Sequence, residues 1–216
     1  MRMKGIVAAV LTLALAACMC PAAALANQGG YQAAAAPAPL VAQSAKSGKW
    51  VVRTKDYRFT IPKYWRGKVQ WKTTSYRWQN NAGKWRKSYH TSVYLKGHKG
   101  DNAYKLVDVG HTTGFGSDEV PLVTKYTKRQ DHPYFRLHVT VLAINYPYKV
   151  WAYAHGETPW NMPTSVKAQK KLLKLSTGNK VSYKAARKSA DYGTKNYKAV
   201  AKYLKPKFEK SLKVLV

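Results

Sequence analysis

One stretch of the chain, residues 68–96, combines the two kinds of side chain that bind charged polymers. Lys and Arg side chains attract phosphate and carboxylate groups, and the flat faces of Trp and Tyr rings stack on sugars or bases. The pattern predicts a binding surface for anionic groups, formed by Lys72, Arg77, Trp78, Lys84, Trp85, Arg86 and Lys87. The opposing interpretation is a strand pair whose rings are half-buried and whose cations are simply solvated.

A β-hairpin is the element expected to position these side chains. Residues 80–83 read Asn-Asn-Ala-Gly, a composition typical of a four-residue hairpin loop between two β-prone runs. If Gln79 faces Lys84 across that loop, Trp78 lies directly opposite Trp85. Such cross-strand aromatic pairs stabilise a hairpin by roughly 0.2–1 kcal/mol.

The charge of the chain is strongly positive. It holds 38 Lys and Arg against 9 Asp and Glu, a formal net charge of +29. Residues 1–48 contain Arg2, Lys4 and Lys46 and no acid, which leaves 35 basic and 9 acidic residues, a formal +26, for the remainder. Lysine meets phosphate as a point charge rather than as a rigid fork, which favours attraction without sequence preference. The expected partners are an anionic cell-wall polymer or an acidic glycan, with nucleic acid bound only non-specifically. High charge can equally be a general property of an exported surface.

Sequence motifs for catalysis are missing. There is no Gly-x-Ser-x-Gly, no His-Glu-x-x-His and no phosphate-binding glycine loop. The polar residues that could be gathered into a metal or acid–base site are His111, Asp118, Asp131, His132, His138 and Glu157. However, Asp131-His132-Pro133 is typical of a turn, and adjacent residues on a strand point to opposite faces. We therefore predict no catalytic residue, no metal site and no cofactor.

Residues 1–26 have the layout of a secretory signal, with a basic front end, an apolar run and small residues at 24–26. A second processing site competes with cleavage after Ala26, because residues 15–18 (Leu-Ala-Ala-Cys) resemble a bacterial lipobox in which Cys18 is lipidated. An uncleaved anchor is a third alternative, since about 20 apolar residues can span a bilayer. We expect an extracellular or cell-surface protein that contacts a membrane surface through a lipid anchor if Cys18 is used.

The rest of the chain divides into a linker and one domain. Residues 27–48 are rich in Ala, Pro, Gly and Ser and predict a flexible linker. Residues 49–216 form a single basic domain with no cysteine, because Cys18 and Cys20 both lie in the leader. The domain therefore has no disulfide and no cysteine-ligated metal.

Hydrophobic periodicity predicts an α+β domain. Between residues 50 and 154, alternating and β-prone runs predict strands at 57–61, 68–79, 84–96, 103–110, 120–129, 134–144 and 148–154. After Pro163 the spacing becomes helical, with helices expected at 164–175, at 182–190 and over a segment that Pro206 ends. A short last strand is expected within 212–216. The fold class is thus an antiparallel β-sheet of about six to eight strands with two or three C-terminal helices packed on it.

Residues 57–69 read YRFTIPKYWRGKV and resemble the opening strand of an exported domain of Gram-positive bacteria that is often found in lipoproteins. The matching positions are Phe59, Ile61, Pro62, Tyr64, Trp65, Gly67, Lys68 and Val69. Residues 175–183 also resemble the helix-to-turn segment of that family, and Phe-x-x-Pro-x-x-Trp more distantly resembles the entry to the PsbP-like fold. The resemblance implies a fold and a location, and no activity comes with it.

The same motif has a direct physical interpretation. We expect Phe59 and Ile61 to point into the core and Pro62 to end their strand. Tyr64 and Trp65 should cover an edge of the core, and Gly67 should allow the turn into the next strand.

These features favour a non-enzymatic, envelope-associated domain that binds anionic polymers such as teichoic acid, acidic glycans or extracellular nucleic acid. Two alternatives stay open. One is an extracellular hydrolase acting on an acidic polymer, with Glu157 or Asp131 near a His. The other is a surface module for protein–protein interaction.

Overall fold

The computed structural model describes residues 50–111, 118–130, 137–189 and 195–216. The predicted signal peptide and linker, with Cys18 and Ala26, lie outside the described residues, as do Asp131 and His132.

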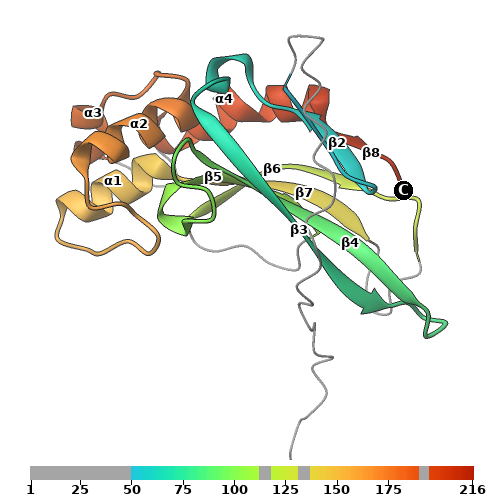
Figure 1. The fold of residues 1–216 in the computed structure, drawn as a ribbon. Coiled ribbons are helices and arrows are strands. Elements are labelled where there is room, and N and C mark those ends of the chain that lie inside the picture. The colour runs from blue at the N-terminus through green and yellow to red at the C-terminus, as the bar shows by residue number, and fades with distance from the viewer. Residues whose placement is uncertain (1–49, 112–117, 131–136, 190–194) are drawn as a thin grey trace, which may run out of the picture. The chain divides into compact units, whose positions relative to one another are not determined.

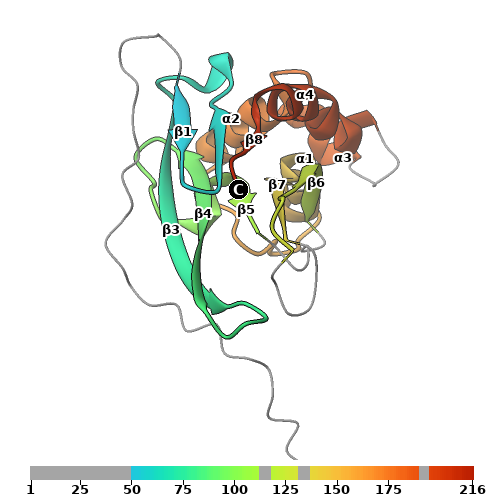
Figure 2. The ribbon, with the colours of Figure 1, turned by 90° about the vertical axis from the view of Figure 1, so that its right-hand side faces the viewer.

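The described strands form two antiparallel sheets (Figure 1). The larger sheet has the order β3-β4-β5-β7-β6, built from β3 (Val69–Gln79), β4 (Trp85–Leu95), β5 (Lys105–Gly110), β6 (Glu119–Tyr126) and β7 (His138–Ile144). The smaller sheet has the order β1-β2-β8, built from β1 (Val51–Arg53), β2 (Tyr57–Thr60) and β8 (Lys213–Val214). Figure 2 shows β8, near the end of the chain, beside β2.

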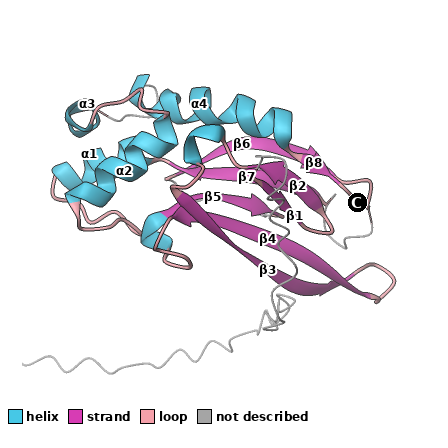
Figure 3. Cartoon of the chain, turned by 45° about the horizontal axis from the view of Figure 1, so that its top comes forward, coloured by secondary structure: helices cyan, strands magenta, loops and turns pink. Residues whose placement is uncertain are grey.

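Among the described residues, four helices follow the strands of the larger sheet and lie on one side of it (Figure 3). They are α1 (Tyr146–Ala154), α2 (Val166–Thr177), α3 (Tyr183–Lys188) and α4 (Lys195–Ser211). The predicted class, α+β with antiparallel strands and C-terminal helices, is confirmed. The expected short last strand is β8, and the helix expected at 182–190 is α3, where the Ser182 hydroxyl accepts a hydrogen bond of 3.1 Å from the Ala185 amide. Within the described segments, no helix is long and apolar enough to cross a membrane.

Two secondary-structure predictions were wrong. Residues 148–154 form most of α1 rather than a strand, because Pro147 suits the first turn of a helix and Val150 and Ala152 pack inward from it. Pro206 lies inside α4 rather than at its end. The buried stripe of Val200, Leu204 and Phe208 continues past the proline, so packing outweighs its local preference.

The hairpin register also differs from the prediction. Gln79 pairs with Trp85 and Trp78 pairs with Arg86, so the two Trp rings lie on opposite faces of the hairpin. The reason is a five-residue loop. The Asn80 side-chain oxygen accepts hydrogen bonds from the amides of Ala82 (3.2 Å) and Lys84 (2.8 Å), which holds one more residue in the turn than expected.

The motif at residues 57–69 lies in the structure as its residues indicate. Phe59, Ile61 and Trp65 are completely buried, and β2 ends before Pro62. The Trp65 indole N–H donates a hydrogen bond of 2.9 Å to the Leu175 carbonyl, which ties a single 3-10 turn, Lys63–Trp65, to α2. Gly67 has a φ of +74°, a conformation that glycine adopts without steric cost. The turn that follows β2 is therefore fixed to the core rather than a loose loop.

Candidate anion-binding clefts

The hairpin presents its predicted cations to solvent. All five are exposed, namely Lys72, Arg77, Lys84, Arg86 and Lys87. Trp85 is 63 % exposed, but Trp78 is only 4 % exposed. The Trp78 indole donates a hydrogen bond of 2.9 Å to the Ser88 hydroxyl, and the Arg129 guanidinium lies 5.1 Å from its ring centroid. Trp78 is thus an interior residue that offers no face to a ligand.

The register divides the hairpin cations between two faces. Arg86 lies on the face of its cross-strand neighbour Trp78, whereas Arg77 and Lys87 pair with each other on the opposite face with Trp85. The hairpin therefore does not form one flat platform of cations and rings.

A denser group of cations lines a cleft of about 600 Å³ between β2, the turn after it, α4 and β8. We call it the first cleft. Its cationic residues are Arg58, Lys63, Arg66, Lys207, Lys210 and Lys213. Arg58 and Lys213 are direct cross-strand partners in the β2–β8 pair, an arrangement of like charges that destabilises a sheet.

A second cleft of about 510 Å³ lies on the other side of the same turn. Its cationic residues are Lys68, Lys96, Lys171 and Lys174, and His98 and Tyr64 also line it. The Lys68 ammonium lies 3.7 Å from the Tyr64 ring centroid, which holds that cation by a cation–π contact.

The two clefts adjoin at the Lys63–Trp65 turn. Lys63 and Arg66 line the first cleft, whereas Tyr64 and Lys68 line the second. No Asp or Glu is among the described residues that line either cleft. In the first cleft, burial lowers the pKa of Lys207, whose ammonium donates a hydrogen bond of 2.8 Å to the Tyr203 carbonyl. An anion bound there would favour the charged form of this lysine.

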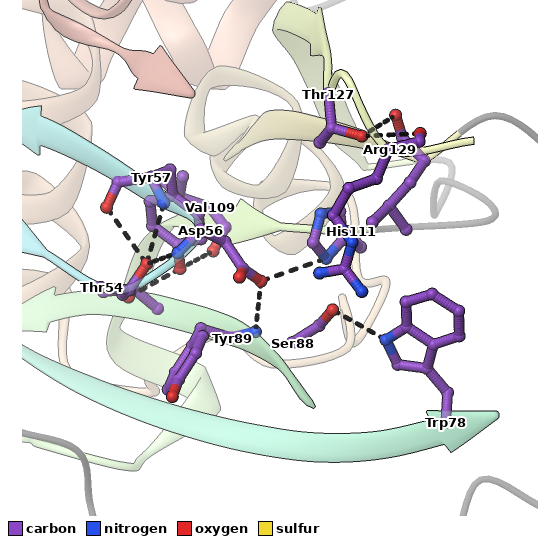
Figure 4. Close-up of polar contacts among 12 residues, drawn as sticks. Thr54, Asp56, Tyr57, Trp78, Ser88, Tyr89, Val109, His111, Thr127 and Arg129 are labelled. Carbon is purple, nitrogen blue, oxygen red and sulfur yellow. Dashed lines mark hydrogen bonds and ion pairs between the residues drawn. The ribbon is translucent and has the colours of Figure 1, made fainter. Parts of the chain in front are cut away.

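Several carboxylates lie away from these clefts, at the larger sheet. Asp118 contacts the Lys149 ammonium at 2.6 Å, and Asp108 contacts the Lys105 ammonium at 2.7 Å. Asp56 is buried beside the end of β5, where its carboxylate accepts a hydrogen bond of 3.2 Å from the Tyr89 amide (Figure 4). None of these three carboxylates is among the lining residues of the clefts, whose described acid or base side chains are all basic.

A smaller cavity of about 200 Å³ contains histidine and carboxylate groups. It is lined by His90, Asp108, Gly110, His111, Glu119, Thr140 and Leu142. The Asp108 carboxylate accepts a hydrogen bond of 2.5 Å from the Ser92 hydroxyl, and the His90 Nε2 atom lies 3.7 Å from it. Because Ser92 donates to Asp108 and not to His90, this is not a serine–histidine–aspartate triad.

The acid–base residues considered from the sequence are only partly brought together. His111 lines this cavity and lies 3.8 Å from the Asp56 carboxylate (Figure 4). Asp118 pairs with Lys149, Glu157 is exposed in the loop after α1, and His138 packs edge-on against the Tyr126 ring. Among the described residues, no three His, Cys, Asp or Glu side chains are placed to hold a metal ion.

Sequence reasoning missed the cationic residues of both clefts and the His90–Asp108–Glu119 cavity. The clefts combine segments that lie far apart in the chain, such as 58–68 and 207–213. One signal of the clefts was present in the sequence, because the motif at 57–69 contains the basic residues Lys63, Arg66 and Lys68. Nothing in the sequence alone showed that the cations of α2 and α4 would lie beside them.

Comparison with known proteins adds no relative. No protein family, curated protein or solved structure matches this chain.

Proposed function

We propose that this domain binds anionic polymers of the cell envelope or its surroundings, and that it holds them in the two adjoining clefts. The observation that carries the proposal is the lining of those clefts. Ten Lys and Arg side chains converge there, and no carboxylate is among the described lining residues. The exported location predicted from residues 1–26 makes cell-wall polymers and acidic glycans the relevant ligands.

The electrostatics of the clefts favour a ligand that carries several negative charges. A concave surface lined by one sign of charge concentrates counter-ions within it. Arg58 and Lys213 face each other across β2 and β8, so a phosphate or carboxylate between them would relieve their repulsion. Most of the cationic lining residues are lysines, which attract anions with little geometric demand. Binding should therefore depend on charge density and salt rather than on monomer identity.

The turn between the clefts determines how long a ligand must be to reach both of them. It is held by the buried Trp65 and its hydrogen bond to the Leu175 carbonyl, so the clefts keep a fixed separation. Lys63 and Lys68 are five residues apart, a span of at most about 18 Å. A linear polyanion can cross that distance and occupy both clefts, which raises avidity through effective concentration.

The described lining of the clefts suits binding better than hydrolysis. Glycoside hydrolysis ordinarily uses two carboxyl groups that flank the scissile bond. The described lining of the clefts contains none. The geometry therefore supports retention of a polymer rather than its cleavage.

The test compares two triple variants with the same loss of charge. One removes lysines of the second cleft (Lys68→Gln, Lys171→Gln, Lys174→Gln), and the other removes hairpin lysines (Lys72→Gln, Lys84→Gln, Lys87→Gln). Binding to purified teichoic acid, hyaluronate and single-stranded DNA is measured across a salt series. We expect the cleft variant to lose about tenfold more affinity than the hairpin variant, and its salt slope to fall by about two, since each lost phosphate contact removes about 0.7.

Each outcome tests a different part of the proposal. Absence of binding to all three polymers at low ionic strength would refute anionic polymer binding. Equal losses in the two triple variants would show that the second cleft contributes no more to binding than the hairpin does, which would contradict the use of both clefts. A series of oligonucleotides of increasing length tests whether affinity rises abruptly once the ligand reaches both clefts.

A further inference from the structure

The far end of the β3–β4 hairpin is a two-stranded ribbon that extends beyond the rest of the larger sheet (Figure 1, Figure 2). The described pairing of β4 with β5 ends at His90 and Gly110, whereas its pairing with β3 continues to Trp85 and Gln79. We call residues 77–87 the hairpin tip. The proposed binding of polymers in the two clefts does not use it.

The two faces of the hairpin tip have different surroundings. On one face Trp78 is buried, with the Arg129 guanidinium against its ring. On the other face Trp85 is 63 % exposed. Trp78 therefore packs the ribbon against the domain, while Trp85 presents a large apolar ring to solvent.

The loop fixes the position from which Trp85 projects. The Asn80 amide donates a hydrogen bond of 3.0 Å to the Lys84 carbonyl, and the Gly83 amide donates one of 2.9 Å to the Asn80 carbonyl. Together with the two bonds that the Asn80 side chain accepts, they close the loop directly before Trp85. A ring on a fixed backbone loses less conformational freedom on binding than one on a loose loop.

The charge of the hairpin tip is entirely positive. It contains Arg77, Lys84, Arg86 and Lys87, all of them exposed, and no Asp or Glu. Arg77 and Lys87 are direct cross-strand partners on the face of Trp85, an arrangement in which like charges repel each other. An anionic group that binds between them would relieve this repulsion.

We propose that the hairpin tip docks on a membrane surface that contains anionic lipids, with the Trp85 ring in the interfacial layer. Trp rings favour this layer because they combine a large apolar area with a polar N–H group. Peripheral binding to a bilayer grows with the apolar area that enters it and with the attraction of cations to anionic lipids. The hairpin tip supplies both contributions at one protruding point.

The placement of the cations favours a bilayer over a soluble polymer as the partner of this surface. Arg86 lies on the face opposite to Arg77 and Lys87, so a chain lying along one face of the ribbon cannot contact all three. A ribbon that enters the headgroup layer end-on meets anionic groups on both faces. The surface is separate from the clefts, and its role does not depend on polymer binding.

The experiment compares two exposed Trp residues on vesicles of two compositions. The purified full chain is titrated with vesicles of phosphatidylcholine alone and with vesicles that contain about one third phosphatidylglycerol. Binding to the neutral vesicles measures any insertion of the apolar residues 1–26, and the gain on the anionic vesicles measures attraction to the charged surface. We expect Trp85→Ala to lower the affinity for the anionic vesicles about tenfold, which corresponds to burial of about 60 Å² of apolar area.

Trp160→Ala is the matched control, because Trp160 is 85 % exposed in the loop after α1. It should change the affinity by less than about twofold. Anionic vesicles with brominated acyl chains give a second readout, since bromine quenches the fluorescence of a Trp ring that enters the bilayer. The quenching should fall in Trp85→Ala and persist in Trp160→Ala.

A pair of lysine variants tests the electrostatic part. Lys84→Gln combined with Lys87→Gln should weaken binding to the anionic vesicles, by about fivefold for each cation. Lys171→Gln combined with Lys174→Gln removes the same charge from the second cleft and should have a smaller effect. Equal effects of the two Trp variants, or of the two lysine pairs, would overturn the proposal without affecting polymer binding in the clefts.

Discussion

Asp56 is a buried residue whose carboxyl group has polar neighbours. Its side chain accepts from the Tyr89 amide, and the His111 Nδ1 atom lies 3.8 Å away (Figure 4). Loss of solvent raises the pKa of Asp56 to about 6, despite the opposing effects of the Tyr89 amide, Arg129 and Ser88. This one residue makes the stability of the fold depend on pH between about 4 and 6.

The sign of that dependence follows from proton binding. Between pH 3.8 and about 6 the folded protein keeps the Asp56 proton while the unfolded chain releases it, so the free energy of unfolding falls as pH rises. When complete, the ionisation of Asp56 lowers the free energy of unfolding by about 3 kcal/mol. Asp56→Asn should remove it, because the amide side chain does not ionise.

The measurement is urea denaturation of the wild type and of Asp56→Asn at a series of pH values from about 4 to 7. The difference between the two curves isolates Asp56 from other titrating groups. A difference that does not change with pH would show that Asp56 titrates near its ordinary range.

At the scale of elements, α4 contains a proline in its interior, and the packing of its buried face keeps the helix continuous there. Pro206 is exposed and lies between the buried residues Leu204 and Phe208. Within a helix, proline is about 3 kcal/mol less favourable than alanine, and its stiffening of the unfolded chain offsets under about 1 kcal/mol of this. Pro206→Ala should therefore raise the free energy of unfolding by about 2 kcal/mol.

Lys205→Ala is the matched control, because it changes an adjacent exposed residue without changing backbone bonding. It should alter stability by less than about 0.5 kcal/mol. If Pro206→Ala were neutral or destabilising in urea denaturation, α4 would not tolerate a regular helix at that point.

The elements also show what sequence can predict here. The β-prone runs that form β2 to β7, the helix expected at 182–190 and the burial of Phe59 and Ile61 depend on local patterns, and these predictions were correct. The helix at Tyr146–Ala154 was missed because its aromatic residues favour strands. What stabilises it as a helix is packing against the other helices, which its own sequence does not show. The hairpin register was missed because one side chain, Asn80, adds a residue to the loop. The clefts and the His90 cavity depend on contacts between distant segments, which no local pattern reports.

At the scale of the whole molecule, the basic residues repel one another. The formal charge of +26 on residues 49–216 comes from 35 cations and 9 acids. Raising NaCl from about 20 mM to about 300 mM shortens the screening length by more than half and weakens this repulsion. We expect urea denaturation midpoints to rise with salt. A midpoint that stays constant or falls would show that local ion pairs, which salt weakens, outweigh the net repulsion.

The β2–β8 pair has a consequence for the order in which the molecule is made. Tyr57 and Arg58 pair with Val214 and Lys213, which follow them by more than 150 residues. A chain that emerges from the ribosome or a translocation channel in N-to-C order cannot form this pair until residues 213–214 are free. The first cleft, which includes Lys213, therefore assembles only after the larger sheet and α4 have emerged, and a chain that is stalled or clipped before Lys213 should lack it.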